Sequence, residues 1–119
     1  MGYDVRFKVK VEGANYWINT GHCDANITWN VGKIIRLSTG LEWKNEANNG
    51  LCKDVIPSIQ RGLNELCRNP DKYKPLESPV GWGTVEGTIG FFERILSQWE
   101  DVVKWEDPEL MNAMSFWIE

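Results

Sequence analysis

The stretch "YDVRFKVKVE", residues 3–12, decides the fold because apolar and polar side chains alternate along it. Valine and phenylalanine occupy every second position from Val5 to Val11, and charged residues lie between them. This period of two is typical of a strand with one buried face and one solvated face. A turn-forming segment at 13–15 and a second strand-like segment at 16–20 follow. Residues 3–20 are therefore predicted to form an antiparallel β-hairpin.

The rest of the chain has mainly helical patterns. In 54–68 and 84–105, apolar residues recur at steps of three and four, which places them on one stripe of a helix. Residues 30–39 show similar spacing and end before a glycine, and 108–118 begin with a proline after an aspartate, both of which are helix signals. We expect four helices over these ranges.

The segments between these helices are expected to be irregular or very short. Residues 44–50, "KNEANNG", have the composition of a loop, and 27–29 have that of a short third strand. Pro57 is expected in the first turn of its helix, where its missing N–H costs no hydrogen bond. The pattern predicts one α+β domain over 1–119, with an N-terminal antiparallel hairpin or small sheet packed against three to four helices.

Composition limits the classes of function. The chain has 119 residues, a net charge of −4 and no run of lysine or arginine, which disfavours direct binding of nucleic acid. No apolar stretch reaches the roughly 18 residues of a membrane span, and no signal peptide is recognisable, so we expect a cytoplasmic protein without membrane contact. The three cysteines fit reduced thiols in that compartment.

No catalytic set or metal motif stands out. His22 is the only histidine, and its neighbour Cys23 would point to the opposite face of an extended chain, so the two make a poor nucleophile–base pair. The cysteines lack the spacing of a metal site. The sequence favours a non-enzymatic protein without metal or cofactor. The enzyme alternative requires His22 to meet a carboxylate such as Glu86 or Glu93.

The strongest candidate for binding is the segment Gly81-Trp82-Gly83-Thr84, directly before the helix over 84–105. A helix start presents free N–H groups that hold phosphate or carboxylate. In this interpretation Gly83 and Thr84 donate N–H groups, Trp82 stacks on a ring, and a cation comes from an arginine. The candidate arginines are Arg36, Arg61 and Arg94.

A packing interpretation explains the same glycines. Gly81 and Gly83 would provide positive φ in a tight turn while Trp82 folds back on the helix. Gly87 and Gly90 would then let another element approach the helix closely. The sequence leaves both interpretations open.

Three segments together resemble small phage and prophage proteins of Gram-positive bacteria: "YDVRFKVKVEG", "LEWKN" and "IPSIQRGLNELCRNPDKYKPLESPVGWGTVEGTIGFFERIL". The most distinctive part is the turn from Asn69-Pro70 to Tyr73, followed by residues 81–84. The resemblance implies a phage accessory protein acting in the bacterial host cytoplasm, and it implies no activity or catalytic residue.

These observations lead to two hypotheses. The first is a non-enzymatic counter-defence or host-modulating protein, a homo-oligomer, that binds a small anionic, nucleotide-like ligand or a host defence protein. The alternative is a structural or assembly protein of the virion that works through oligomer contacts, for which the apolar segment 110–118 would be an interface.

Overall fold

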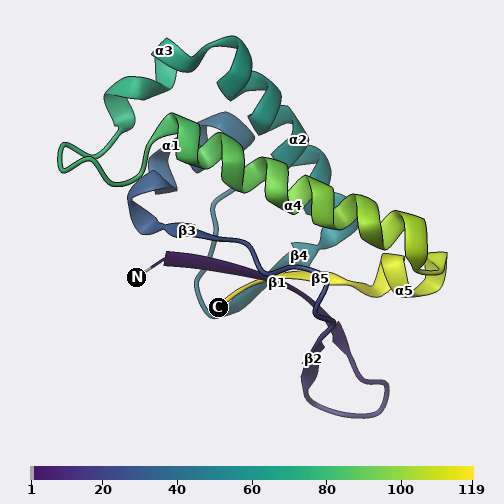
Figure 1. Ribbon diagram of the computed structural model, residues 1–119. Helices are drawn as coiled ribbons and strands as arrows, with labels where there is room; N and C mark the ends of the chain where they lie inside the picture. The colour runs from purple at the N-terminus through teal and green to yellow at the C-terminus, as the bar shows by residue number, and fades with distance from the viewer. Residues whose placement is uncertain (1) are drawn as a thin grey trace.

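The computed structural model describes residues 2–119 and has an α+β fold built on a five-stranded antiparallel sheet (Figure 1). Strand β1 (Gly2–Lys10) lies at its centre. One edge of β1 pairs with β2 (Trp17–Asn19) and β3 (Asn26–Thr28), and the other edge pairs with β5 (Ser115–Ile118). Strand β4 (Ala47–Leu51) pairs with the outer edge of β5. The predicted fold class and N-terminal hairpin are confirmed.

The alternation in β1 separates the two faces of the sheet. Val5 lies opposite Ile118, and Phe7 lies opposite Phe116, and all four side chains are fully buried. Arg6 lies opposite Trp117 on the other face. The apolar face of the sheet is the floor of the core, because α1, α2 and α4 all lie on that side (Figure 1).

The helices expected over 30–39, 54–68 and 84–105 are present with small differences in their bounds. A 3₁₀ turn η1 (Trp29–Val31) leads into α1 (Gly32–Thr39), and α2 spans Cys52–Arg68. Helix α4 (Val85–Trp105) begins after Thr84, whose hydroxyl accepts the N–H of Gly87 at 2.9 Å. Short helical turns α3 (Pro70–Tyr73) and η2 (Lys74–Leu76) connect α2 to the loop before α4.

The prediction of one helix over 108–118 is wrong. Helix α5 covers only Pro108–Ala113, and Met114 has the extended ψ of 135°. The residues after it form β5, in which Phe116 and Ile118 are buried while Trp117 points to the other face. A helix here would leave one edge of β1 unpaired, and the strand instead satisfies that edge with backbone hydrogen bonds.

Two further expectations are corrected. Residues 44–50 were expected to form a loop, but Ala47–Leu51 is strand β4, paired with β5 through an irregular register between Asn48 and Leu51. Its sequence, Ala-Asn-Asn-Gly-Leu, carries no strand pattern, so pairing with the partner strand decides its conformation. Pro57 lies in the second turn of α2 because this helix begins earlier than expected, at Cys52.

Helix packing depends on a glycine other than those expected. A Cβ at Gly62 of α2 would collide with Cγ2 of Thr39 in α1, and it would lie 3.3 Å from Cε2 of Phe92 in α4. A Cβ at Gly90 would meet nothing within 4 Å, and one at Gly87 would meet only the Thr84 hydroxyl of its own cap. The close approach between helices therefore occurs at Gly62.

These surroundings predict opposite effects for two matched substitutions. Gly62→Ala should lower the free energy of unfolding by about 2 kcal/mol, because the added methyl group overpacks the contact between α1, α2 and α4. Gly90→Ala should raise it by roughly 0.5–1 kcal/mol, because alanine is the better residue in an exposed helix. Urea denaturation followed by circular dichroism measures both. Changes of the same sign in the two variants would contradict this account of the packing.

Candidate functional site

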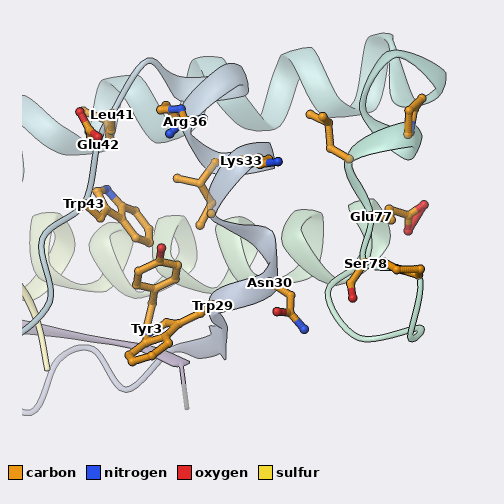
Figure 2. A pocket seen from close by; sticks show the side chains of 15 residues that line it. Tyr3, Trp29, Asn30, Lys33, Arg36, Leu41, Glu42, Trp43, Glu77 and Ser78 are labelled. Atoms are coloured by element: carbon orange, nitrogen blue, oxygen red, sulfur yellow. The ribbon is translucent and has the colours of Figure 1, made fainter.

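A groove of about 540 Å³ lies beside α1 and is the main candidate for a binding site (Figure 2). One wall is α1 with the preceding turn η1, and the opposite wall is formed by residues 75–79. Tyr3 of β1 and the segment 41–43 close the end near the sheet. The volume falls in the range typical of small-molecule sites.

Local sequence features shape this groove. Gly32 leaves room for the Tyr3 hydroxyl, which would lie 2.9 Å from a Cβ at that position. Gly40, with φ of 77°, ends α1 and donates its N–H to the Arg36 carbonyl at 2.9 Å. The Thr39 hydroxyl then accepts the N–H of Leu41 at 3.0 Å, which turns the chain back over the groove. A left-handed residue after a helix is the usual way to make such a turn.

Aromatic rings form the wall near the sheet. The ring of Trp43 packs edge-on against Tyr3 at 5.4 Å and also contacts Phe91 and Phe116, so the core holds it in place. Trp29, by contrast, is 41% exposed. An exposed indole beside a groove offers a flat surface on which a planar ligand stacks.

Two cations lie on the α1 side of the groove. Lys33 and Arg36 are three residues apart and therefore share one side of the helix (Figure 2). Among residues 2–119, neither forms an ion pair. Two carboxylates also line the groove, but that of Glu77 accepts the N–H of Val85 at 3.3 Å and so lies at the positive end of α4. The carboxylate of Glu42 lies on the rim near Arg36 (Figure 2).

The structure places the predicted segment 81–84 next to this groove but not in its lining. The N–H of Gly81 bonds to the Ser78 carbonyl at 3.1 Å, which forms a turn. Trp82 is 69% exposed, so it does not fold back on the helix as the packing interpretation expected. Gly83 lies against η1, where a Cβ would approach Cβ of Asn30 to 2.8 Å.

The three candidate arginines have different surroundings. Arg36 lines the groove, whereas Arg61 donates to the Ser58 hydroxyl at 2.8 Å and Arg94 pairs with Asp24 at 2.6 Å. Hydrogen bonds from Gln98 and then Arg94 hold the pKa of Asp24 below its usual range. Of the candidate residues Gly81, Trp82, Gly83, Thr84, Arg36, Arg61 and Arg94, only Arg36 lines the groove.

Sequence reasoning missed Trp29, Lys33 and Tyr3 as site residues. The spacing of Lys33 and Arg36 was a usable signal, because two cations three residues apart lie on one side of a helix. Nothing in the sequence linked Lys33 and Arg36 to Tyr3, which lies about thirty positions earlier and reaches the groove through the central strand.

Among residues 2–119, His22 forms no ion pair or hydrogen bond with Glu86 or Glu93 and pairs instead with Glu106. Its Nε2 lies 2.9 Å from Oε1 of Glu106. Neither residue lines the groove. The pair joins the loop after β2 to the end of α4, which is a structural role.

Burial makes two of the three cysteines poor nucleophiles. Cys23 and Cys52 are buried, and Cys67 is exposed. Burial raises the pKa of Cys23 to about 11 and raises the pKa of Cys52 further. A thiol with so high a pKa carries almost no thiolate at neutral pH.

Thiol labelling tests this assignment. At pH 8 Ellman's reagent should react rapidly with one thiol of the folded protein, that of Cys67, and with all three only after unfolding. The variant Cys67→Ser identifies the reactive residue, because it should abolish the rapid phase. A rapid phase that persists in this variant would contradict the burial of Cys23 and Cys52.

Two alanine substitutions in the turn, at Gly81 and Gly83, distinguish the cost of a left-handed backbone torsion from the cost of a steric contact. Gly81 and Gly83 have φ of 80° and 86°, but only Gly83 touches another segment. Gly81→Ala should cost about 1 kcal/mol of stability for the left-handed torsion. Gly83→Ala should cost about 2–4 kcal/mol, because the methyl group also collides with η1. Thermal denaturation of both variants checks the order, and equal losses would contradict the contact.

Within residues 2–119, no cluster of three or more histidine, cysteine, aspartate or glutamate side chains is arranged to hold a metal ion. The same residues include no helix with the length and apolar character needed to cross a membrane. Comparison with protein-family models, curated proteins and solved structures finds no match to this chain.

Proposed function

We propose that the protein is a non-enzymatic binding protein that captures a small anionic ligand with a planar ring, such as a nucleotide, in the groove beside α1. The proposal rests on the two unpaired cations and the exposed aromatic ring in this groove. Two cations without ion-pair partners, Lys33 and Arg36, line the same groove as the exposed ring of Trp29. Unpaired cations attract phosphate, and an exposed indole attracts a base.

The residues have separate tasks in this arrangement. The guanidinium of Arg36 and the ammonium of Lys33 hold the phosphate, with Arg36 offering a bidentate fork. Trp29 stacks on the ring of the ligand. Asn30 and Ser78 also line the groove and offer polar atoms to the ligand. Binding then depends on both the charge and the ring of the ligand.

The groove is a better anion site than the start of α4, where the sequence suggested one. Three of the first four N–H groups of α4 already have acceptors within the chain. That of Val85 bonds to the Glu77 carboxylate at 3.3 Å, and those of Gly87 and Thr88 bond to Thr84. A ligand at this helix start would compete with a carboxylate of the protein itself.

The biological setting is part of the proposal and rests on the resemblance to phage proteins. A phage accessory protein that holds a nucleotide without converting it lowers the free concentration of that nucleotide in the host cytoplasm. Such sequestration fits a counter-defence or host-modulating role.

Calorimetric titration with AMP, ATP and inorganic phosphate tests the proposal. We expect micromolar binding of the nucleotides and much weaker binding of phosphate alone, because phosphate lacks the ring. Arg36→Ala and Trp29→Ala should each weaken nucleotide binding by roughly tenfold or more.

Matched controls locate the site. Arg61→Ala and Trp82→Ala remove the same residue types from positions outside the groove and should leave the affinity within about twofold. Loss of binding in Trp82→Ala but not in Trp29→Ala would move the site to residues 81–84. Absence of binding by all three probes would overturn the proposal for this ligand class.

A further inference from the structure

The chain that closes the groove beside α1 at its sheet end has two local features that cost free energy. Glu46 has φ of 53°, and among residues 2–119 it is the only residue other than glycine with a left-handed φ. Trp43, which lines the groove, has a buried Nε1–H that finds no acceptor within the same part of the chain. Features of this kind persist only where neighbouring contacts hold the chain in place.

The side chain of Asn49 provides such contacts. Its Oδ1 accepts the N–H of Lys44 at 2.7 Å, and its Nδ2 donates to the Lys44 carbonyl at 2.8 Å and to the Ala47 carbonyl at 3.0 Å. Because a backbone N–H only donates, these bonds also fix the orientation of the amide. They bridge the turn at Asn45 and Glu46 and tie it to β4.

An irregularity of the sheet distinguishes Asn49 from its neighbour. The register between β4 and β5 shifts between Asn48 and Leu51, so Asn49 lies where the ladder is interrupted. A bulge of this kind redirects a side chain. Asn48 makes one side-chain hydrogen bond, in which its Oδ1 accepts the N–H of Gly50 at 2.9 Å. Asn49 therefore both donates and accepts, whereas Asn48 only accepts.

Asn49 holds one end of the segment 41–43, and Thr39 holds the other. Between these ends, the ring of Trp43 packs 5.4 Å from the ring of Tyr3 (Figure 2). Asn49 itself does not line the groove. Without its hydrogen bonds, the segment is free to relax and to expose the unpaired indole N–H of Trp43 to water.

We infer that Asn49 is a positioning residue for the groove, because its amide keeps the segment 41–43 where it forms the aromatic end. This role rests on the proposed function, since the ring of a nucleotide occupies that end in the proposed complex. Lys33 and Arg36 lie on α1, so the phosphate end does not depend on Asn49. Loss of the Asn49 hydrogen bonds should therefore weaken binding of a nucleotide more than binding of phosphate alone.

Amide hydrogen exchange measured by NMR tests the contacts of Asn49 without a ligand. Asn49→Asp keeps the acceptor for the Lys44 N–H, but it loses both donors and places a carboxylate against two carbonyl oxygens. The Lys44 amide should exchange at least about tenfold faster, while the amides of β1 and α4 stay unchanged. Asn48→Asp keeps the one bond of Asn48 and should exchange like the original chain. Unchanged exchange of Lys44 in Asn49→Asp would overturn the inference, because the ring contacts of Trp43 would then suffice.

A double variant separates this local effect from a general loss of stability. Glycine adopts a left-handed φ at little cost, so Glu46→Gly leaves a turn that needs less support. In Asn49→Asp with Glu46→Gly, the Lys44 amide should exchange roughly threefold slower than in Asn49→Asp alone. Equal or faster exchange in the double variant would also overturn the inference.

Calorimetric titration with AMP and with inorganic phosphate tests the consequence for binding. Asn49→Asp should weaken AMP binding roughly three- to tenfold and change phosphate binding by less than about twofold. Asn48→Asp adds the same charge one residue away and should change neither affinity.

The two probes distinguish the possible failures. A purely structural defect weakens both probes alike, so equal losses for AMP and phosphate would overturn the inference. If the original chain binds no AMP, the proposed function fails, and the exchange of the Lys44 amide still decides whether Asn49 holds the segment 41–43.

Discussion

Backbone pairing between β1 and β5 is the constraint on which the other parts of the structure depend. It places Val5 opposite Ile118 and Phe7 opposite Phe116 at the floor of the core. Strand β4 joins the sheet only through β5, and α2 begins directly where β4 ends. The candidate groove beside α1 depends on the same pairing, because Tyr3 comes from β1 and the ring of Trp43 packs against Phe116 of β5.

The predictable parts of the fold are those with their own local pattern. In residues 3–12, apolar side chains recur at every second position, and in 84–105 they recur at steps of three and four. Each pattern alone identifies the buried face of its element, so β1 and α4 were predictable from the sequence. Strands β4 and β5 have no comparable signal. Residues 47–51, Ala-Asn-Asn-Gly-Leu, are rich in turn-forming asparagine and glycine and lack apolar alternation. Residues 115–118 continue an apolar run that also suits a helix. Their conformation comes from the free edge of a distant strand, which no local window contains.

The candidate site was less predictable from the sequence than the fold, because it too depends on contacts between distant segments. Residues 81–84 drew attention because glycine and tryptophan are conspicuous, and the structure explains the glycines by left-handed turns and by the contact of Gly83 with η1. The groove instead combines β1, η1, α1 and the segment 75–79. Lys33 and Arg36 carry no distinctive sequence signal. They become candidate site residues only because the fold places them, without ion-pair partners, in a groove that an aromatic ring also lines.

The separation of β1 and β5 along the chain also affects how the protein folds during synthesis. More than a hundred residues lie between the two strands, so at typical translation rates β1 waits roughly 5–20 s for its partner. During that time the hairpin has one unpaired edge with Val5 and Phe7 exposed beside it. The nascent chain therefore passes through an aggregation-prone stage that ends only when β5 is available to pair with β1.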